Sequence, residues 1–187
     1  MRTRRTAGRF AAAAAGIMAV ASVAGAVSAT ALARTGGSHA ARAAATHHAC
    51  RAAALRLRLA GTDTGAGSTV LTVMVTNRSA AACSLQGYPA LRLARPDGSA
   101  APARIGPGRG ELFAGMSPAE VRLRPGGRAS FFLVYRDFNP GTGRPGAAIS
   151  ALRVRLPGVA GRFTVRARFA PFGPLSVSPI RAGARRE

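Results

Sequence analysis

From Leu55 onward, apolar and polar residues alternate almost one by one along the chain. Residues 55–59 (LRLRL) are the clearest example, because each leucine there is separated from the next by an arginine. Successive side chains of a β-strand point to opposite faces of a sheet, so a period of two predicts strands with one buried face. The same pattern recurs at residues 69–77, 88–93, 120–125, 129–135, 151–157, 161–169 and 174–180.

The segments between these predicted strands are rich in Gly, Pro, Asn and Asp, which favour tight turns. They read GTDTGAGS, RPDGSA, RPGG, NPGTGRPG and GVAG. No helical period is evident after residue 50. Seven or eight short strands at this spacing predict an all-β fold, an antiparallel β-sandwich of immunoglobulin-like type.

The N-terminal region predicts export. Four arginines precede residue 10, and an uncharged run of mostly Ala, Val and Gly follows from Ala11 to Ala33, which is the pattern of a secretory signal peptide. An uncleaved membrane anchor is the alternative, and it would be the chain's only membrane contact. We therefore expect a signal segment at 1–33, a flexible linker at 34–49, the sandwich at 50–180 and a basic tail at 181–187. The expected location is secreted or in the cell envelope, outside the cytoplasm.

Cys50 and Cys83 are the only cysteines, and an exported domain meets an oxidising environment, so a disulfide between them is predicted. A hairpin turn centred near position 64.5 would place residue 79 opposite Cys50, and a bulge or turn would have to absorb the remaining offset. A catalytic thiolate is disfavoured because neither cysteine has an activating neighbour in a known nucleophile pattern.

Several short motifs resemble those of a known family. They are N-x-S at 77–79, C-x-L-x-G-Y-P at 83–89, L-x-P-G-G at 123–127, LRVRLPG at 152–158 and LSVSPI at 175–180. Together they resemble the secreted actinobacterial family called domain of unknown function 4232, over residues 50–180. The resemblance implies an exported immunoglobulin-like module with no established catalytic residues. Members commonly carry a second cysteine pair, which this chain lacks.

The residue types present exclude several chemistries. The chain has no Lys, which rules out Schiff-base and P-loop lysine mechanisms. All three His (His39, His47 and His48) fall in the predicted linker, so a Ser-His-Asp arrangement has no base within the domain. We therefore expect no catalytic residues, no enzyme activity, no cofactor and no metal site.

The formal net charge of +21 comes entirely from arginine, because all 27 basic residues are Arg. The candidate anion-binding face comprises arginines that alternate with the apolar residues of their strands: Arg56, Arg58, Arg153, Arg155, Arg162, Arg166 and Arg168. The alternative is that a GC-rich genome fills solvent-exposed positions with Arg. The expected function is an exported module that binds an unknown protein or cell-envelope polymer. Binding of a polyanion through the Arg-rich faces is the alternative. Nucleic acid is disfavoured because the chain carries no recognised nucleic-acid motif.

Overall fold

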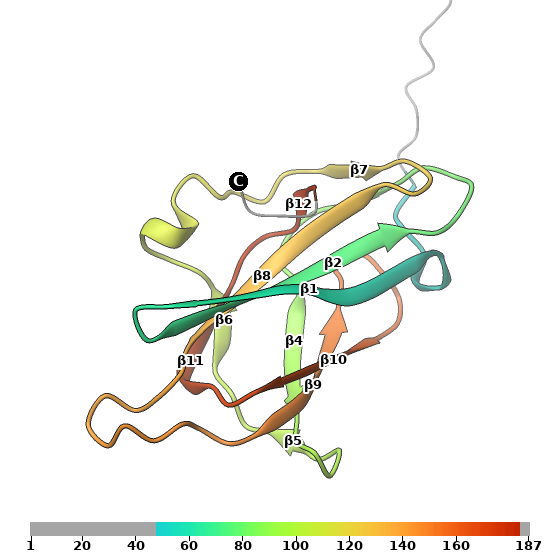
Figure 1. Cartoon of the computed structure of the whole chain (residues 1–187). Helices are drawn as coiled ribbons and strands as arrows, with labels where there is room; N and C mark the ends of the chain where they lie inside the picture. Colours follow the sequence, from blue (N-terminus) through green and yellow to red (C-terminus); the bar gives the residue numbers. More distant parts are fainter. Residues whose placement is uncertain (1–47, 184–187) are drawn as a thin grey trace, which may run out of the picture. The chain divides into compact units, whose positions relative to one another are not determined.

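Two facing β-sheets and a small two-stranded ribbon make up the described part of the chain, residues 48–183, in this computed structural model (Figure 1). The predicted signal segment, nearly all of the predicted linker and the end of the predicted tail lie outside the described residues. Among the described residues, the first to form a β-bridge is Ala49, which pairs in parallel with Ser84.

The elements follow one another along the chain with two short 3-10 turns among the strands. They are η1 (Ala52–Ala54), β1 (Leu55–Gly65), β2 (Ser68–Asn77), β3 (Cys83–Leu85), β4 (Ala90–Ala94), β5 (Ala100–Ala101), β6 (Ile105–Pro107), η2 (Glu111–Phe113), β7 (Val121–Leu123), β8 (Arg128–Arg136), β9 (Ile149–Arg155), β10 (Phe163–Phe169), β11 (Phe172–Val177) and β12 (Arg181–Ala182).

The larger sheet has the order β1-β2-β8-β11-β6, with β12 also paired to β8. The smaller sheet has the order β10-β9-β4-β5, and β3 pairs with β7 in the ribbon. The predicted all-β sandwich is confirmed. Two details differ from the prediction: β11 and β6 run parallel, and the described residues include four further strands, β3, β5, β6 and β12. These have only two or three residues each, too few to show a period of two.

The β1–β2 hairpin corrects the prediction for the segment GTDTGAGS. We expected a turn there, but β1 continues through Gly65, and only Ala66 and Gly67 form the turn. Both have positive φ angles, 48° and 73°. Positive φ at both central residues is characteristic of a type I′ turn, which suits two-residue hairpins because its twist matches that of the flanking strands. Cross-strand pairing therefore prevails over the turn-like composition of residues 61–65.

The core lies between the two sheets and is built from the inward side of each period-two pattern. Alternate residues of β2, such as Val73 and Val75, are fully buried, and so are Leu152 and Val154 of β9. Full burial of a Val, Leu or Phe side chain contributes about 1.5 to 3 kcal/mol. The alternation predicted from the sequence thus becomes the two inner faces of the sandwich.

Strand β8 is the exception, because its residues are buried on both faces. Phe131 points into the core and is 0% exposed, while its neighbour Phe132 on the opposite face is only 5% exposed. Phe113 of η2 covers that outer face, with its ring centroid 5.4 Å from that of Phe132. Gly108 leaves room for it, since a Cβ there would lie 2.0 Å from the Phe113 ring. The segment between β6 and β7 therefore covers the outer face of β8, the central strand of the larger sheet.

This packing predicts that Phe113→Ala lowers the free energy of unfolding by about 3 kcal/mol, because it leaves a cavity over β8. Phe138→Ala is the matched control, since Phe138 is 43% exposed and its loss is expected to cost under about 1 kcal/mol. Urea denaturation followed by circular dichroism measures both. Equal losses in the two variants would contradict the assignment of Phe113 to the core.

Candidate functional site

The predicted disulfide is present and joins the entry of β1 to the start of β3. Cys50 and Cys83 are bonded with their Cα atoms 4.9 Å apart, and both are buried. The antiparallel register ends at the pair of Leu55 and Asn77, so the hairpin turn lies further along the chain than predicted. The expected position opposite Cys50, residue 79, was wrong. Instead, the chain at Cys50 runs parallel to β3, where the Cys50 N–H donates to the Ser84 carbonyl at 3.3 Å.

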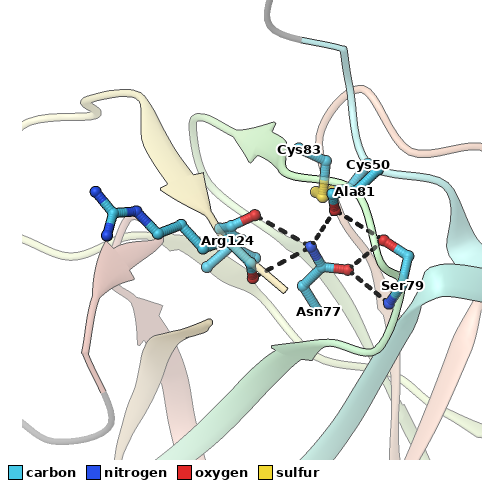
Figure 2. The surroundings of a disulfide bond; sticks show 7 residues. Cys50, Asn77, Ser79, Ala81, Cys83 and Arg124 are labelled. Carbon is cyan, nitrogen blue, oxygen red and sulfur yellow. Dashed lines mark hydrogen bonds between the residues drawn. A yellow bond between two sulfur atoms is a disulfide. The ribbon is translucent and has the colours of Figure 1, made fainter. Parts of the chain in front are cut away.

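Next to the disulfide, the side chain of Asn77 holds three segments together (Figure 2). Its amide nitrogen donates to the carbonyl oxygens of Ala81 at 2.8 Å, Leu123 at 3.1 Å and Arg124 at 3.3 Å. Its Oδ1 accepts from the backbone N–H of Ser79 at 3.0 Å and from the Ser79 hydroxyl at 2.7 Å. Because Asn77 is 0% exposed, the N-x-S motif is a structural turn and its amide is not accessible for glycosylation.

The L-x-P-G-G motif completes the same corner. The Asn77 N–H donates to the Gly127 carbonyl at 3.0 Å, and the Gly126 N–H donates back to the Asn77 carbonyl at 2.9 Å. Gly126 has a φ of 72°, and a Cβ on Gly127 would lie 2.8 Å from the Arg124 carbonyl oxygen. Both glycines are therefore required by the backbone.

Two further motifs are also structural. The Ile180 N–H donates to the carbonyl of Gly87 at 2.9 Å, which links the end of LSVSPI to C-x-L-x-G-Y-P. Ser178 is 0% exposed, and its hydroxyl accepts from the Phe132 N–H at 3.0 Å. The residues that carry the family resemblance are thus largely occupied in holding strands together, and a functional surface has to be sought among exposed side chains.

Several exposed arginines share the outer side of the smaller sheet. We call it the arginine face, and it consists of Arg92 on β4, Arg153 and Arg155 on β9, Arg162 just before β10, and Arg166 and Arg168 on β10. All six are exposed, whereas the residues that alternate with them, such as Leu152 and Val165, are buried. Strands β4, β9 and β10 contain no Asp or Glu.

The structure divides the predicted anion-binding residues between two sheets. Arg153, Arg155, Arg162, Arg166 and Arg168 belong to the arginine face. Arg56 and Arg58 lie on β1 in the larger sheet, where the Arg58 guanidinium contacts the Met74 sulfur at 3.7 Å. The predicted anion-binding face also omitted Arg92, which β4–β9 pairing places directly opposite Arg153. Period two identifies an outward side chain, but it does not show which strand lies next to it.

Arg153 is held in place by the turn between β4 and β5. Its Nη2 donates to the carbonyl oxygen of Gly98 at 2.9 Å. The same turn contains Asp97, whose pKa is lowered by hydrogen bonds from Ser99 and further by the charge of Arg95. The Asp97 carboxylate accepts from the Ser99 N–H at 2.8 Å and so is bound within its own turn.

Two adjoining hollows open on this side of the molecule. One, of about 170 Å³, is lined by Ala90, Leu91, Arg92, Arg153, Arg155 and Arg162. The other, of about 430 Å³, is lined by Tyr88, Ala90, Arg155 and residues 156–160. Ala90 and Arg155 line both hollows. Such a surface can hold anions through guanidinium groups.

Within residues 48–183, no group of three or more His, Cys, Asp or Glu side chains is placed to hold a metal ion. The same residues include no helix long and apolar enough to cross a membrane.

These features define a disulfide-bonded all-β sandwich with a basic outer sheet face. Residues 50–181 match the family described as Domain of unknown function (DUF4232), so the chain belongs to this family. Neither the curated proteins nor the solved structures include a match to the chain.

Removing the disulfide should destabilise the fold mainly through the unfolded chain. The bond closes a separation of 33 residues, for which the Cys50→Ala/Cys83→Ala variant is expected to lose about 3 to 4 kcal/mol of unfolding free energy. Urea denaturation measures the loss, and intact mass before and after reduction reports the bond itself. An unchanged urea midpoint in the double variant would contradict this role.

Asn77→Asp should lower the free energy of unfolding strongly, although it changes the shape of the side chain only slightly. The carboxylate replaces an amide donor that faces three carbonyl oxygens, so we expect a loss above about 3 kcal/mol. Ser79→Ala is the control and should cost only about 1 kcal/mol, because it removes a neutral hydroxyl. Similar losses in both variants, measured by urea denaturation, would show that Asn77 does not organise the corner.

Proposed function

We propose that this protein is an exported, non-enzymatic binding module whose partner is an anionic polymer of the cell envelope, held at the arginine face. The observation that carries the proposal is the grouping of six exposed arginines on the outer side of β4, β9 and β10, strands without a carboxylate. Clustered charges of one sign produce a surface potential that attracts polymers of the opposite sign.

Arginine is suited to this task by its geometry as well as its charge. Its planar guanidinium presents several N–H donors in a fixed fork that fits the oxygens of phosphate or carboxylate groups. Neighbouring strands and alternate residues along a strand place these forks at regular intervals over the sheet. A polymer with repeated anionic groups could therefore contact several of them at once.

The proposed location outside the cytoplasm is supported by two independent features. The N-terminal sequence has the pattern of a signal peptide. The Cys50–Cys83 disulfide belongs to the kind of bond that forms and persists in oxidising compartments. The proposed absence of catalysis is supported by the use of the motif residues, since Asn77 and Ser178 are buried and hydrogen-bonded within the fold.

A nucleic acid is the less favoured polyanion. Single strands are bound with the help of aromatic side chains on which bases stack. Among the described residues, the only large hydrophobic side chain that is well exposed is Phe138, which is not part of the arginine face. A polymer with a saturated, sugar-containing backbone does not depend on such stacking.

The proposal predicts that the purified exported protein binds an isolated wall polymer with a phosphodiester backbone, and that the affinity falls as salt rises. Arg166→Glu/Arg168→Glu should weaken binding by about tenfold or more, because two attractive contacts become repulsive. Arg56→Glu/Arg58→Glu is the matched control. It makes the same change in net charge, with the same spacing along a strand, but on the other sheet.

Biolayer interferometry at several salt concentrations measures these affinities, and a neutral glycan is the negative probe. The control variant is expected to retain affinity within about threefold of the wild type. If the two double variants weaken binding equally, the polymer responds only to net charge, and the arginine face is not a binding surface. Saturable binding of a protein from envelope extracts, unaffected by the Arg166/Arg168 change, would also overturn the proposal.

A further inference from the structure

We propose that the hollow between Arg92, Arg153, Arg155 and Arg162 is a discrete site for one phosphate group, and that the adjoining hollow beside Tyr88 receives the sugar ring attached to it. This inference rests on the proposed function and names the repeating unit that the arginine face would recognise. The ligand is thus a sugar phosphate unit of a polymer.

The first argument is the pairing of Arg92 with Arg153. The β4–β9 register sets these residues directly opposite each other, and both are exposed on the same side of the sheet. Side chains in directly opposed positions have their Cβ atoms about 4.5 to 5.5 Å apart, and like charges there are destabilising. No acidic residue of either strand compensates the pair. An anion bound between the two guanidinium groups would turn this repulsion into attraction.

The second argument is the fixed position of Arg153. Its Nη2 is bound to the Gly98 carbonyl at 2.9 Å, which restrains the guanidinium before any ligand arrives. A guanidinium has five N–H donors, so the others stay available to an anion. A side chain that is already restrained loses less conformational entropy on binding.

The third argument is the shape and lining of the hollow. Four arginines surround a space of about 170 Å³, and its remaining lining residues are the small or apolar Ala90 and Leu91. A carboxylate has two oxygens in one plane, which a single guanidinium fork can satisfy. A phosphate group carries several acceptor oxygens in a tetrahedral arrangement, so it can accept from several forks at once. Four arginines that line one hollow therefore favour phosphate.

The sugar position follows from the second hollow. It has a volume of about 430 Å³ and shares Ala90 and Arg155 with the first, so a group attached to the phosphate would extend directly into it. Tyr88, Pro157 and Val159 give it an apolar wall. The ring of Tyr is apolar and its hydroxyl can form hydrogen bonds, so the side chain can contact both the apolar and the polar parts of a sugar ring.

A lipid headgroup is the other source of phosphate, and the observations favour the polymer. Proteins that lie on a membrane usually insert apolar side chains below the headgroups. The arginine face and its hollows include no well-exposed large hydrophobic side chain, since Phe138 is the only one among the described residues.

The test uses the full exported chain and three probes: inorganic phosphate, glucose 1-phosphate and glucose. Isothermal titration calorimetry should give saturable binding of both phosphates, with glucose 1-phosphate tighter. Arg92→Gln/Arg153→Gln should weaken both by about tenfold or more, since two charged hydrogen-bonding partners are lost. Arg56→Gln/Arg58→Gln, which makes the same change in charge on the other sheet, is the matched control and should stay within about twofold of the wild type.

Tyr88→Leu separates the two hollows. It should leave inorganic phosphate binding unchanged and abolish the advantage of glucose 1-phosphate. Thermal melts give a second readout that does not depend on the sugar. Phosphate should raise the melting temperature of the wild type, and Arg92→Gln should melt higher than the wild type in phosphate-free buffer, because it relieves the like-charge pair.

The outcomes distinguish this inference from the function on which it rests. One outcome would be that Arg92→Gln/Arg153→Gln and Arg166→Gln/Arg168→Gln weaken wall-polymer binding equally, and that neither double variant affects binding of free phosphate. The face would then bind polymer without a discrete phosphate site, and only this inference would fail. If no arginine variant affects polymer binding, the proposed function fails as well. Binding to vesicles of phosphatidylglycerol as tight as to the polymer, and equally sensitive to Arg92, would identify a membrane surface and overturn the sugar phosphate assignment.

Discussion

The buried amide of Asn77 is the interaction on which the arrangement of this domain depends. It ends β2 and bonds to the carbonyl oxygens of the segment before β3, of the last residue of β7 and of the β7–β8 connection. The Cys50–Cys83 disulfide lies at the same corner and ties the start of β1 to β3. Because a buried polar group left unpaired costs free energy, the hydrogen bonds of the Asn77 side chain stabilise this arrangement of the segments.

The residues at this corner have structural roles, and the residues available for function lie elsewhere. The motifs that resemble those of the family are used in turns, in buried hydrogen bonds and in the core, as Gly127 and Ser178 illustrate. Exposed positions on the outer strands are free of these demands, so their side chains can vary in chemistry without loss of the fold. The arginine face is one of the exposed surfaces that these structural roles leave available.

Strand pairing determines where the arginines of this protein lie relative to one another. A net charge of +21 spread evenly over the surface would attract any polyanion weakly and would favour no particular binding geometry. The β4–β9 register instead sets Arg92 against Arg153 and gathers Arg155 and Arg162 around one hollow. Exposed arginines on β1, such as Arg56, lie on the other sheet and do not contribute to that hollow. The same residue type therefore has different surroundings on the two sheets.

The sequence alone determined the all-β class, eight of the strand segments, the core-facing side of strands such as β10, and the Cys50–Cys83 bond. These follow from local period and from the pairing of two cysteines. Only the tertiary structure decided the parallel pairing of β11 with β6, the extension of β1 to Gly65, and the meeting of Arg92 with Arg153. The physical reason is that a period of two fixes the direction of a side chain, whereas the choice of neighbouring strand depends on packing between segments far apart in the chain.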